Sequence, residues 1–277
     1  MLTYNNQGRY KDVLELGNEM KKIIPETSLE DKNTSAISNI YRINGLALGY
    51  LGFDKAGQKD IKTAISYVEK VESKNTKMYL LSLCYQNMNI YYVNNQIQNK
   101  AFRDSTLYCL NKSTAAAEQI EDNNAEVSND LKYEQIGFNY MRLGIFYLEQ
   151  ADKKGSIEQA EKYLLKGLKI YENKTYKISD NNRIMMLNQV SWLYTEKKDY
   201  RKSIDYAQRA LALEQKFPDP YDRVESFEFL ATSYLGLGEN KKSKVYMDKY
   251  TYLKDSLRSV ERNSVENSCK ANSFRSY

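Results

Sequence analysis

Tyrosine recurs along this chain at a spacing that sets its architecture. At each recurrence a tyrosine is the last residue of a stripe of core-facing residues along one helix, and we call it the stripe-closing tyrosine. A short polar turn follows, and a second helix is expected to begin around a small residue. The six tyrosines are Tyr4, Tyr50, Tyr91, Tyr147, Tyr194 and Tyr234, spaced 46, 41, 56, 47 and 40 residues apart. A period of this size predicts stacked helical hairpins rather than one globular core. Such an array presents a long surface for holding a partner and usually has no catalytic centre.

The best-preserved unit covers residues 183–216. Its first helix carries one stripe at the spacing i, i+3, i+4 and i+7, formed by Leu187, Val190, Ser191 and Tyr194. Residues 197–199 form the turn, and a second stripe over residues 200–213 is followed by Pro218, which stops the helix. Small residues such as Ser191 let the two helices approach closely. This unit is therefore predicted to be a helical hairpin.

Weaker copies of the same pattern occupy the rest of the chain. We count five full hairpins and one half over residues 1–257. The first hairpin is incomplete, as expected of a fragment whose upstream part has been removed, because only three residues precede Tyr4. Polar, turn-like linkers are expected at residues 26–33, 122–130 and 177–182. Residues 258–277 show little apolar periodicity, so we predict a frayed helix followed by disorder there. The fold class is expected to be all-α.

The composition argues against catalysis. The chain has no histidine, which removes the commonest general base and the commonest zinc ligand. Its cysteines, Cys84, Cys109 and Cys269, form no CxxC motif, and a bridge between Cys84 and Cys109 is left open because both fall in one hairpin. No phosphate-binding glycine loop, GxSxG or HExxH motif is present. We therefore expect no enzyme activity, no metal and no cofactor.

Charge and hydropathy bear on the partners. The formal charge of +5 comes from 41 basic and 36 acidic residues that are mixed along the chain. A nucleic-acid binder usually gathers Lys and Arg on one face, whereas the lysine pairs here are isolated. No run of about 18 apolar residues exists, the length that a membrane-spanning helix needs. We expect neither nucleic-acid binding nor a membrane span in this segment.

These patterns resemble the tetratricopeptide repeat. In that family the first helix carries a large residue, Leu, a small residue and Tyr; the second follows Gly-x-Tyr and carries Ala, an aromatic residue, Ala-Leu and Pro. The matching positions are Leu187, Val190, Ser191, Tyr194, Tyr200, Ser203, Ala210 and Leu211, then Leu143, Gly144, Tyr147, Ala160, Gly167 and Leu168, and in the half unit Gly8, Tyr10, Val13, Met20 and Pro25. The resemblance covers about residues 1–257. It implies a right-handed α-solenoid of about five and a half repeats, and says little about function.

A narrower resemblance lies at the end of the array. Residues 246–257, YMDKYTYLKDSL, look like the last repeat of tetratricopeptide sensor regions in Bacteroidetes-type signalling proteins. In those proteins the repeats precede a membrane helix and then a histidine kinase or a helix-turn-helix transcription regulator, none of which follows here. The resemblance implies at most the detached sensor part of such a protein. The compartment is left open between cytoplasm and periplasm.

In the tetratricopeptide fold the first helices of successive hairpins line a concave face, where we expect a ligand. The residues beside the core stripe of those helices are aromatic, thioether and amide side chains, which suit an extended or helical peptide. The candidate ligand-binding residues are Asn44, Tyr85, Asn89, Tyr92, Met141, Asn188 and Trp192. Trp192, near Asn188, is the leading anchor. The chaperone-binding subclass of the family grips a terminal carboxylate with Lys, Arg and Asn; because our groove positions hold neither Lys nor Arg, we expect no such specificity.

Three functions are compatible with this array. The first, which we favour, is non-catalytic peptide or protein binding by the sensor or regulatory part of a bacterial signalling or transcription-regulatory protein. The second is a structural assembly module, such as a homodimer formed through exposed end hairpins. The third is a receptor for a small molecule or glycan. One stability prediction also follows: Asn87 stands where other hairpins carry Leu or Val, so Asn87→Leu should stabilise the chain.

Overall fold

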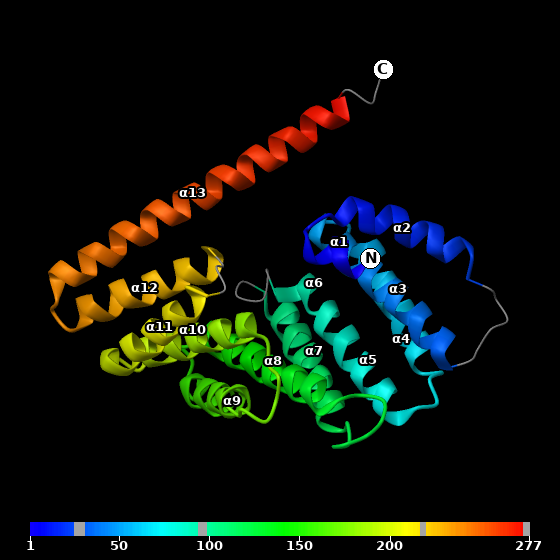
Figure 1. The fold of residues 1–277 in the computed structure, drawn as a ribbon, viewed down its shortest axis with the longest axis horizontal. Coiled ribbons are helices and arrows are strands. Elements are labelled where there is room, and N and C mark those ends of the chain that lie inside the picture. Colours follow the sequence, from blue (N-terminus) through cyan, green and yellow to red (C-terminus); the bar gives the residue numbers. More distant parts are fainter. Residues whose placement is uncertain (25–30, 94–98, 217–219, 274–277) are drawn as a thin grey trace. The chain divides into compact units, whose positions relative to one another are not determined.

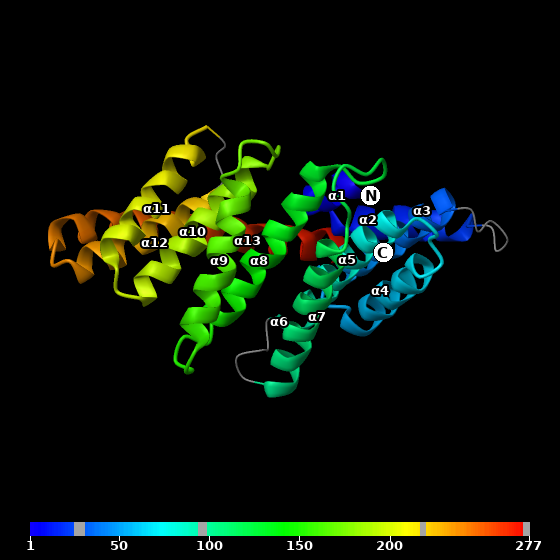
Figure 2. The same cartoon turned by 90° about the horizontal axis from the view of Figure 1, so that it is seen from below.

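The computed structural model describes residues 1–24, 31–93, 99–216 and 220–273, and every regular element in these ranges is an α-helix (Figures 1 and 2). The all-α prediction is therefore confirmed. The chain divides into two compact units: unit 1 is residues 1–149 with 175–177, and unit 2 is residues 150–174 with 178–277. Within the described ranges, no helix combines the length and the apolar character that crossing a membrane requires. A single solenoid over residues 1–257 stays a prediction.

Unit 1 is built from helical hairpins. Its helices are α1 (Leu2–Asn6), α2 (Tyr10–Lys22), α3 (Asp31–Tyr50), α4 (Asp54–Val68), α5 (Lys74–Met88), α6 (Ile90–Val93), α7 (Lys100–Glu118) and α8 (Asn129–Leu148). α3 packs along α4, α5 packs along α7, and α8 packs on α7 (Figure 1). α4 also contacts α5. Two hairpins therefore share one core, which includes Ile61, Val68, Leu80, Cys84 and Cys109.

Unit 2 repeats the hairpin plan. Its helices are α9 (Ser156–Tyr171), α10 (Asp180–Glu196), α11 (Tyr200–Glu214), α12 (Pro220–Gly236) and α13 (Asn240–Ser273). α10 pairs with α11 and α12 with α13, while α9 packs on α10 and α11 on α12. The predicted hairpin over residues 183–216 matches α10 and α11. The helix α13 extends to Ser273, well into the stretch where we predict fraying, and residues 274–277 lie outside the described residues.

Four turns within the hairpins share one backbone geometry. A residue with positive φ stands two residues before the second helix in each: Gly8 at 68°, Gly52 at 80°, Lys198 at 58° and Gly238 at 76°. The N–H of the following residue then donates to a carbonyl five residues back, over 2.8–2.9 Å; the acceptors are Tyr4, Leu48, Tyr194 and Tyr234. Such a left-handed residue with a back-reaching N–H is a common way to end a helix. The recurrence of this turn supports a repeated structural unit.

The turn geometry corrects the sequence register of the hairpin formed by α3 and α4. Leu48, not Tyr50, accepts the turn hydrogen bond that Tyr194 and Tyr234 accept elsewhere. Tyr50 is 56% exposed, whereas Tyr194 and Tyr234 are 7% and 8% exposed. Our assignment of Tyr50 as a stripe-closing residue is therefore wrong by two positions. The periodicity misled because Ala47, three residues before Tyr50, is also buried and supports the shifted stripe.

In the corrected register, glycines occupy the crossing of α3 and α4. A Cβ on Gly45 would lie 2.9 Å from the carbonyl oxygen of Gly57, closer than real Cβ atoms approach. The space beside them is filled by Tyr91, whose hydroxyl donates to the carbonyl oxygen of Gly45 over 2.5 Å. Tyr91 is 4% exposed. Tyr91 of α6 thus packs into the hairpin formed by α3 and α4. Glycine is needed on both of those helices for this close approach.

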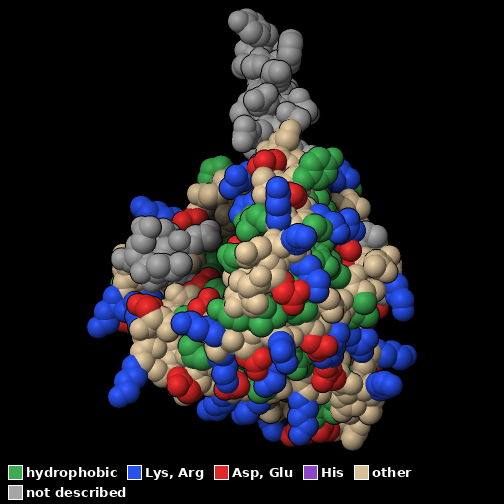
Figure 3. Space-filling view, turned by 90° about the vertical axis from the view of Figure 1, so that its left-hand side faces the viewer, with side chains coloured by type: hydrophobic (Ala, Val, Ile, Leu, Met, Phe, Trp, Pro, Cys, Tyr) green, Lys and Arg blue, Asp and Glu red, His purple; other side chains and the backbone are tan. Residues whose placement is uncertain are grey.

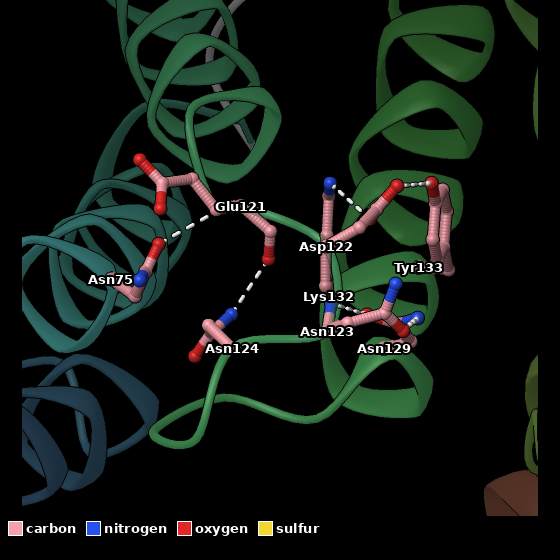
Figure 4. Close-up of polar contacts among 8 residues, drawn as sticks. All are labelled: Asn75, Glu121, Asp122, Asn123, Asn124, Asn129, Lys132 and Tyr133. Carbon is pink, nitrogen blue, oxygen red and sulfur yellow. Dashed lines mark hydrogen bonds and ion pairs between the residues drawn. The ribbon is translucent and has the colours of Figure 1, made fainter.

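The loop between α7 and α8 is closed by its own polar side chains (Figure 4). Asn123, with φ of 54°, donates its N–H to Oδ1 of Asn129 over 2.9 Å, and Nδ2 of Asn129 donates back to Oδ1 of Asn123 over 2.9 Å. Asp122 accepts from Nζ of Lys132 over 2.6 Å and from the hydroxyl of Tyr133 over 3.0 Å. The side chains of this polar loop therefore hold its shape rather than reach for a ligand.

Candidate functional site

The candidate site is a cavity of about 340 Å³ in unit 1. Five helices, α3, α5, α6, α7 and α8, contribute to its wall. The lining residues are Leu46, Gly49, Tyr50, Gln86, Asn87, Asn89, Ile90, Val93, Leu110, Phe138 and Arg142. The volume falls at the lower end of the roughly 300–1,000 Å³ that ligand pockets occupy. The lining combines an apolar wall with a few polar groups, as such pockets do.

Two buried amides in this wall are incompletely paired. Asn87 is 6% exposed and Asn89 is 3% exposed. Neither Nδ2 of Asn87 nor Oδ1 of Asn89 has a hydrogen-bond partner among the described residues. An unpaired buried amide atom costs about 1–3 kcal/mol, so native proteins rarely leave one without a reason. The two residues stand at the junction of α5, which ends at Met88, and α6, which begins at Ile90, and both line the same cavity.

Arg142 brings a positive charge to the same cavity. It projects from α8, is half-buried, and makes no hydrogen bond or ion pair with any described residue. Burial lowers the pKa of its guanidinium, while the charge of Glu149 acts in the opposite direction. A guanidinium nevertheless stays protonated in proteins, with five donors to satisfy. The cavity wall therefore brings a half-buried cation close to two buried amides, each of which has one unpaired atom.

A buried polar network holds the opposite end of this wall. Oε1 of Gln86 accepts from Nε2 of Gln135 over 2.6 Å, and the same Nε2 lies 2.9 Å from Oγ of Ser82. Ser113 donates to Oδ1 of Asn139 over 2.9 Å, and Nδ2 of Asn139 donates to Ser82 over 3.2 Å. The network ties α5, α7 and α8 together. It keeps the cavity wall in place before any ligand arrives, which reduces the ordering cost of binding.

Three of the predicted ligand-binding residues are buried in the helix packing. Met141 and Asn188 are both 0% exposed, and Asn44 is 3% exposed. Nδ2 of Asn44 donates to Asp60 over 2.6 Å, between α3 and α4. Asn188 joins α10 to α12 by two hydrogen bonds, with the carbonyl of Asp222 and the hydroxyl of Ser226. These side chains leave almost no surface for a ligand, because residues at this helical position face a neighbouring helix.

The other four predicted residues lie at three separate places. Asn89 lines the cavity, whereas Tyr85 and Tyr92 line a different cavity of unit 1. Trp192 belongs to unit 2, is half-buried, and donates Nε1 to Oε1 of Glu196 over 3.0 Å. Each unit therefore holds part of the predicted set. Ligand binding by these residues stays a prediction.

Sequence reasoning missed Gln86, Asn87 and Arg142 as cavity residues. Gln86 and Arg142 each directly follow a residue that we predicted to bind a ligand, Tyr85 and Met141. Arg142 nevertheless brings a charge to this cavity, and the absence of Lys and Arg from the predicted groove positions stays a prediction. The available signal was a charged residue, Arg142, directly beside the apolar stripe of its helix. That signal is weak, because the orientation of α8 against its neighbours decides which of its side chains faces the cavity.

The two cysteine side chains that the structure describes offer no reactive group. Cys84 and Cys109 are both free and buried, which answers the question of a bridge between them. Burial raises the pKa of Cys84 to about 11 and that of Cys109 to about 12, so both stay protonated at neutral pH. A protonated, buried thiol is a small apolar side chain rather than a nucleophile. In the described parts of the chain, no group of three or more Cys, Asp or Glu side chains is placed to hold a metal ion.

Comparison with known proteins supports the fold. No family model and no curated protein matches the chain. Among solved structures, it is similar to one described as the crystal structure of BtubC (BKLC) from P. vanneervenii, with 14% sequence identity and a TM-score of 0.64 over 90% of each chain. At that level of identity the likeness shows a shared fold and carries nothing about function.

Proposed function

We propose that this chain is a non-catalytic module that binds a peptide or protein segment in the unit 1 cavity, with an acidic group of the segment at Arg142. The observation that carries the proposal is one wall in which the Arg142 guanidinium lines the cavity beside Asn87 and Asn89, whose Nδ2 and Oδ1 are buried without a partner. Rotation of these two amides into the cavity would let a peptide backbone supply a carbonyl for the first and an N–H for the second. A carboxylate matches the planar guanidinium and forms charge-assisted hydrogen bonds with it.

We further propose that the module is a tetratricopeptide-type solenoid from a bacterial sensor or regulatory protein. The repeated positive-φ turns and the small residues at the helix crossings support the repeat type. The sequence of residues 246–257 supports the signalling role. The gene around this segment tests the role: a membrane helix, kinase or DNA-binding part in the same reading frame is expected. A reading frame that encodes none of these would count against it.

The binding proposal is tested with two fluorescent peptide pools that are identical except that every Glu in one is Gln in the other. The Glu pool is expected to bind the full chain, measured by anisotropy, and the Gln pool at least about tenfold more weakly. Arg142→Gln should remove the difference between the pools. Arg103→Gln, on α7, makes the same change in net charge outside the cavity lining and should preserve it.

Two outcomes would overturn the binding proposal. One is equal binding of both pools to the wild-type chain, which would remove the role of the acidic group. The other is an unchanged preference of Arg142→Gln for the Glu pool, which would show that the acidic group is recognised at another place. Because Arg142 makes no hydrogen bond or ion pair with the described residues, its substitution is not expected to unfold unit 1.

A second candidate function, self-association, is favoured by one observation in unit 2. The exposed large hydrophobic side chains of its described residues all lie on α12, α13 and the turn between them: Tyr221, Leu235, Leu237, Val245, Met247 and Tyr252. Figure 3 shows the end of the molecule where that turn lies, with hydrophobic side chains interspersed among charges of both signs. Exposed apolar side chains on these two helices can bury against a second copy.

Sedimentation velocity over a hundredfold range of concentration tests self-association. Tyr252→Glu should then shift the chain towards monomer. Ile23→Glu is the matched control. The side chains of Ile23 and Tyr252 are both 79% exposed, but only Tyr252 is one of the exposed apolar residues of α12 and α13. A wild-type chain that stays monomeric throughout would remove this candidate.

A further inference from the structure

A second cavity of unit 1, of about 410 Å³, lies against a different face of α5 and α6. Tyr85, Met88 and Tyr92 face this second cavity, whereas Gln86, Asn89 and Ile90 face the one described above. α4 and α7 complete its wall. Its volume lies in the roughly 300–1,000 Å³ range of small-molecule sites. The two cavities therefore offer two chemically distinct surfaces on one short helical segment.

Tyrosine rings dominate this cavity. Tyr85, Tyr92 and Tyr108 line it, and Tyr85 and Tyr108 form an edge-to-face pair with ring centroids 6.2 Å apart. Met88 and Cys109, 6% and 3% exposed, form the deeper part, while Tyr108 is 55% exposed. Burial raises the pKa of Tyr85 and Tyr92, so these rings stay neutral at physiological pH. The surface is thus a set of neutral aromatic faces with hydroxyls at their edges.

Two opposite charges accompany the rings without pairing. Lys62 on α4 and Asp104 on α7 both line the cavity and are exposed. Neither makes a hydrogen bond or an ion pair with any described residue, and the same holds for the hydroxyl of Tyr92. The site therefore presents a free ammonium donor and a free carboxylate acceptor beside apolar faces. A purely apolar ligand would leave both unused.

We propose that this second cavity binds a sugar ring of hexose size. A pyranose is apolar on its C–H faces, which can stack on the tyrosine rings, and carries hydroxyls around its edge that both donate and accept. Asp104 accepts from such hydroxyls, and Lys62 donates to them. The aromatic faces and the unpaired charges each match one part of that ligand. This site is independent of the peptide cavity, since the two share no lining residue.

Saturation-transfer NMR on the full chain tests the proposal with four probes: glucose, galactose, mannose and N-acetylglucosamine. At least one is expected to show transfer, strongest at the C–H protons of one ring face. Tyr108→Ala should reduce the transfer at least fivefold, Tyr108→Phe should largely retain it, and Asp104→Asn should weaken it. Tyr252→Ala, at an exposed tyrosine of unit 2, is the control and should have no effect.

The competing occupant is an apolar aromatic ring, for which p-cresol is the probe. Transfer to p-cresol but to none of the sugars would overturn the proposal, as would sugar transfer that survives Tyr108→Ala. No transfer to any sugar at 10 mM would also overturn it. Arg142→Gln separates the two sites: it should weaken binding of the Glu-containing peptides and leave any sugar signal unchanged.

Discussion

The two units bury the same kind of polar residue and treat it differently. In unit 2, Asn188 is 0% exposed and uses both sides of its amide, donating to the carbonyl of Asp222 over 2.9 Å and accepting from Ser226 over 2.7 Å. In unit 1, Asn87 and Asn89 are nearly as buried, and each leaves one amide atom unpaired. Asn44, packed between α3 and α4, also leaves its Oδ1 unpaired. An unpaired amide atom therefore points to a ligand only where its residue also lines a cavity, as Asn87 and Asn89 do.

The helix crossings differ in the same sense. The small residues at the corresponding positions are Gly45 and Gly57 in unit 1 and Ser191 and Ser203 in unit 2. The serine hydroxyls lie 3.0 Å apart, and Ser191 donates to the carbonyl of Ser203 over 2.9 Å. The glycines instead leave space that Tyr91 fills. The helix crossing in unit 2 is thus held by hydrogen bonds between serines, and the one in unit 1 by the packing of the Tyr91 side chain.

The largest expected effect comes from closing the space at the glycine crossing. A Cβ at position 57 would lie 2.0 Å from the hydroxyl oxygen of Tyr91. We expect Gly57→Ala to cost unit 1 about 2–4 kcal/mol of unfolding free energy, more than the roughly 1 kcal/mol that alanine gains in helix propensity. Urea unfolding followed by circular dichroism measures this. Ser203→Ala at the equivalent place is the control, with an expected loss of about 1–2 kcal/mol. A smaller loss in Gly57→Ala than in the control would contradict the role of Tyr91.

A comparable loss is expected when the paired asparagine of unit 2 is removed. Asn188→Ala removes both hydrogen bonds between α10 and α12, leaves the Ser226 hydroxyl only its 3.2 Å bond to the Asp222 carbonyl, and opens a void between the helices. We expect a cost of about 2–3 kcal/mol. Asn87→Ala in unit 1 should cost less than about 1 kcal/mol, because the unpaired Nδ2 is lost with the side chain. Equal losses in the two variants, measured by urea unfolding, would remove the distinction between the units.

Replacing Asn87 by an apolar residue should raise the stability of unit 1, whereas replacing Asn188 lowers that of unit 2. Asn87→Leu removes an unpaired buried donor and adds apolar burial, so we expect a gain of about 1 kcal/mol in unfolding free energy. The same variant should weaken binding of the Glu-containing peptide pool, because a donor is lost from the cavity wall. Thermal melting and anisotropy measure the two effects. A lowered melting temperature would show that the amide supports the fold instead.

The smallest expected effect concerns pH and the loop between α7 and α8. Hydrogen bonding from Lys132, with a further bond from Tyr133, holds the pKa of Asp122 below its ordinary value of 3.8. A lowered pKa means that the contribution of Asp122 to stability is present at neutral pH and is lost as the pH falls from about 5 through its folded-state pKa. Because Asp122 is half-exposed, we expect less than about 1 kcal/mol. The stability difference between the wild type and Asp122→Asn should therefore vanish near pH 2, and a difference that persists there would contradict this origin.

The helices were predictable from the sequence, but their faces were only partly so. The stripe ending at Tyr194 and its turn at residues 197–199 correspond to α10, the turn and α11, because apolar spacing and helix-ending residues are local signals. The register of α3 was missed by two residues, since Tyr50 looks like a stripe-closing tyrosine although the turn bond goes to Leu48. Aromatic identity in a sequence does not reveal which carbonyl a turn will use.

The candidate site was less predictable for a related reason. Asn89, a predicted ligand-binding residue, lines a cavity, whereas the predicted Met141 is buried and its neighbour Arg142 lines the wall. One residue along a helix turns the side chain by about 100°, so a small error in helix orientation exchanges a core residue for a cavity residue. The cavity that Asn87 and Asn89 line also involves α3, α7 and α8, so it depends on packing between helices and has no local signal in the sequence.

The hydroxyl of Tyr91 on the Gly45 carbonyl carries an implication for how this chain can vary among relatives. Positions 45, 57 and 91 cannot be substituted independently, because a side chain at position 57 would occupy the place of the hydroxyl oxygen of Tyr91. A homologue with alanine or serine at 57 should therefore carry a shorter residue at 91, and one that retains tyrosine there should retain both glycines. Covariation among these three sites would mark every lineage that kept this hairpin junction.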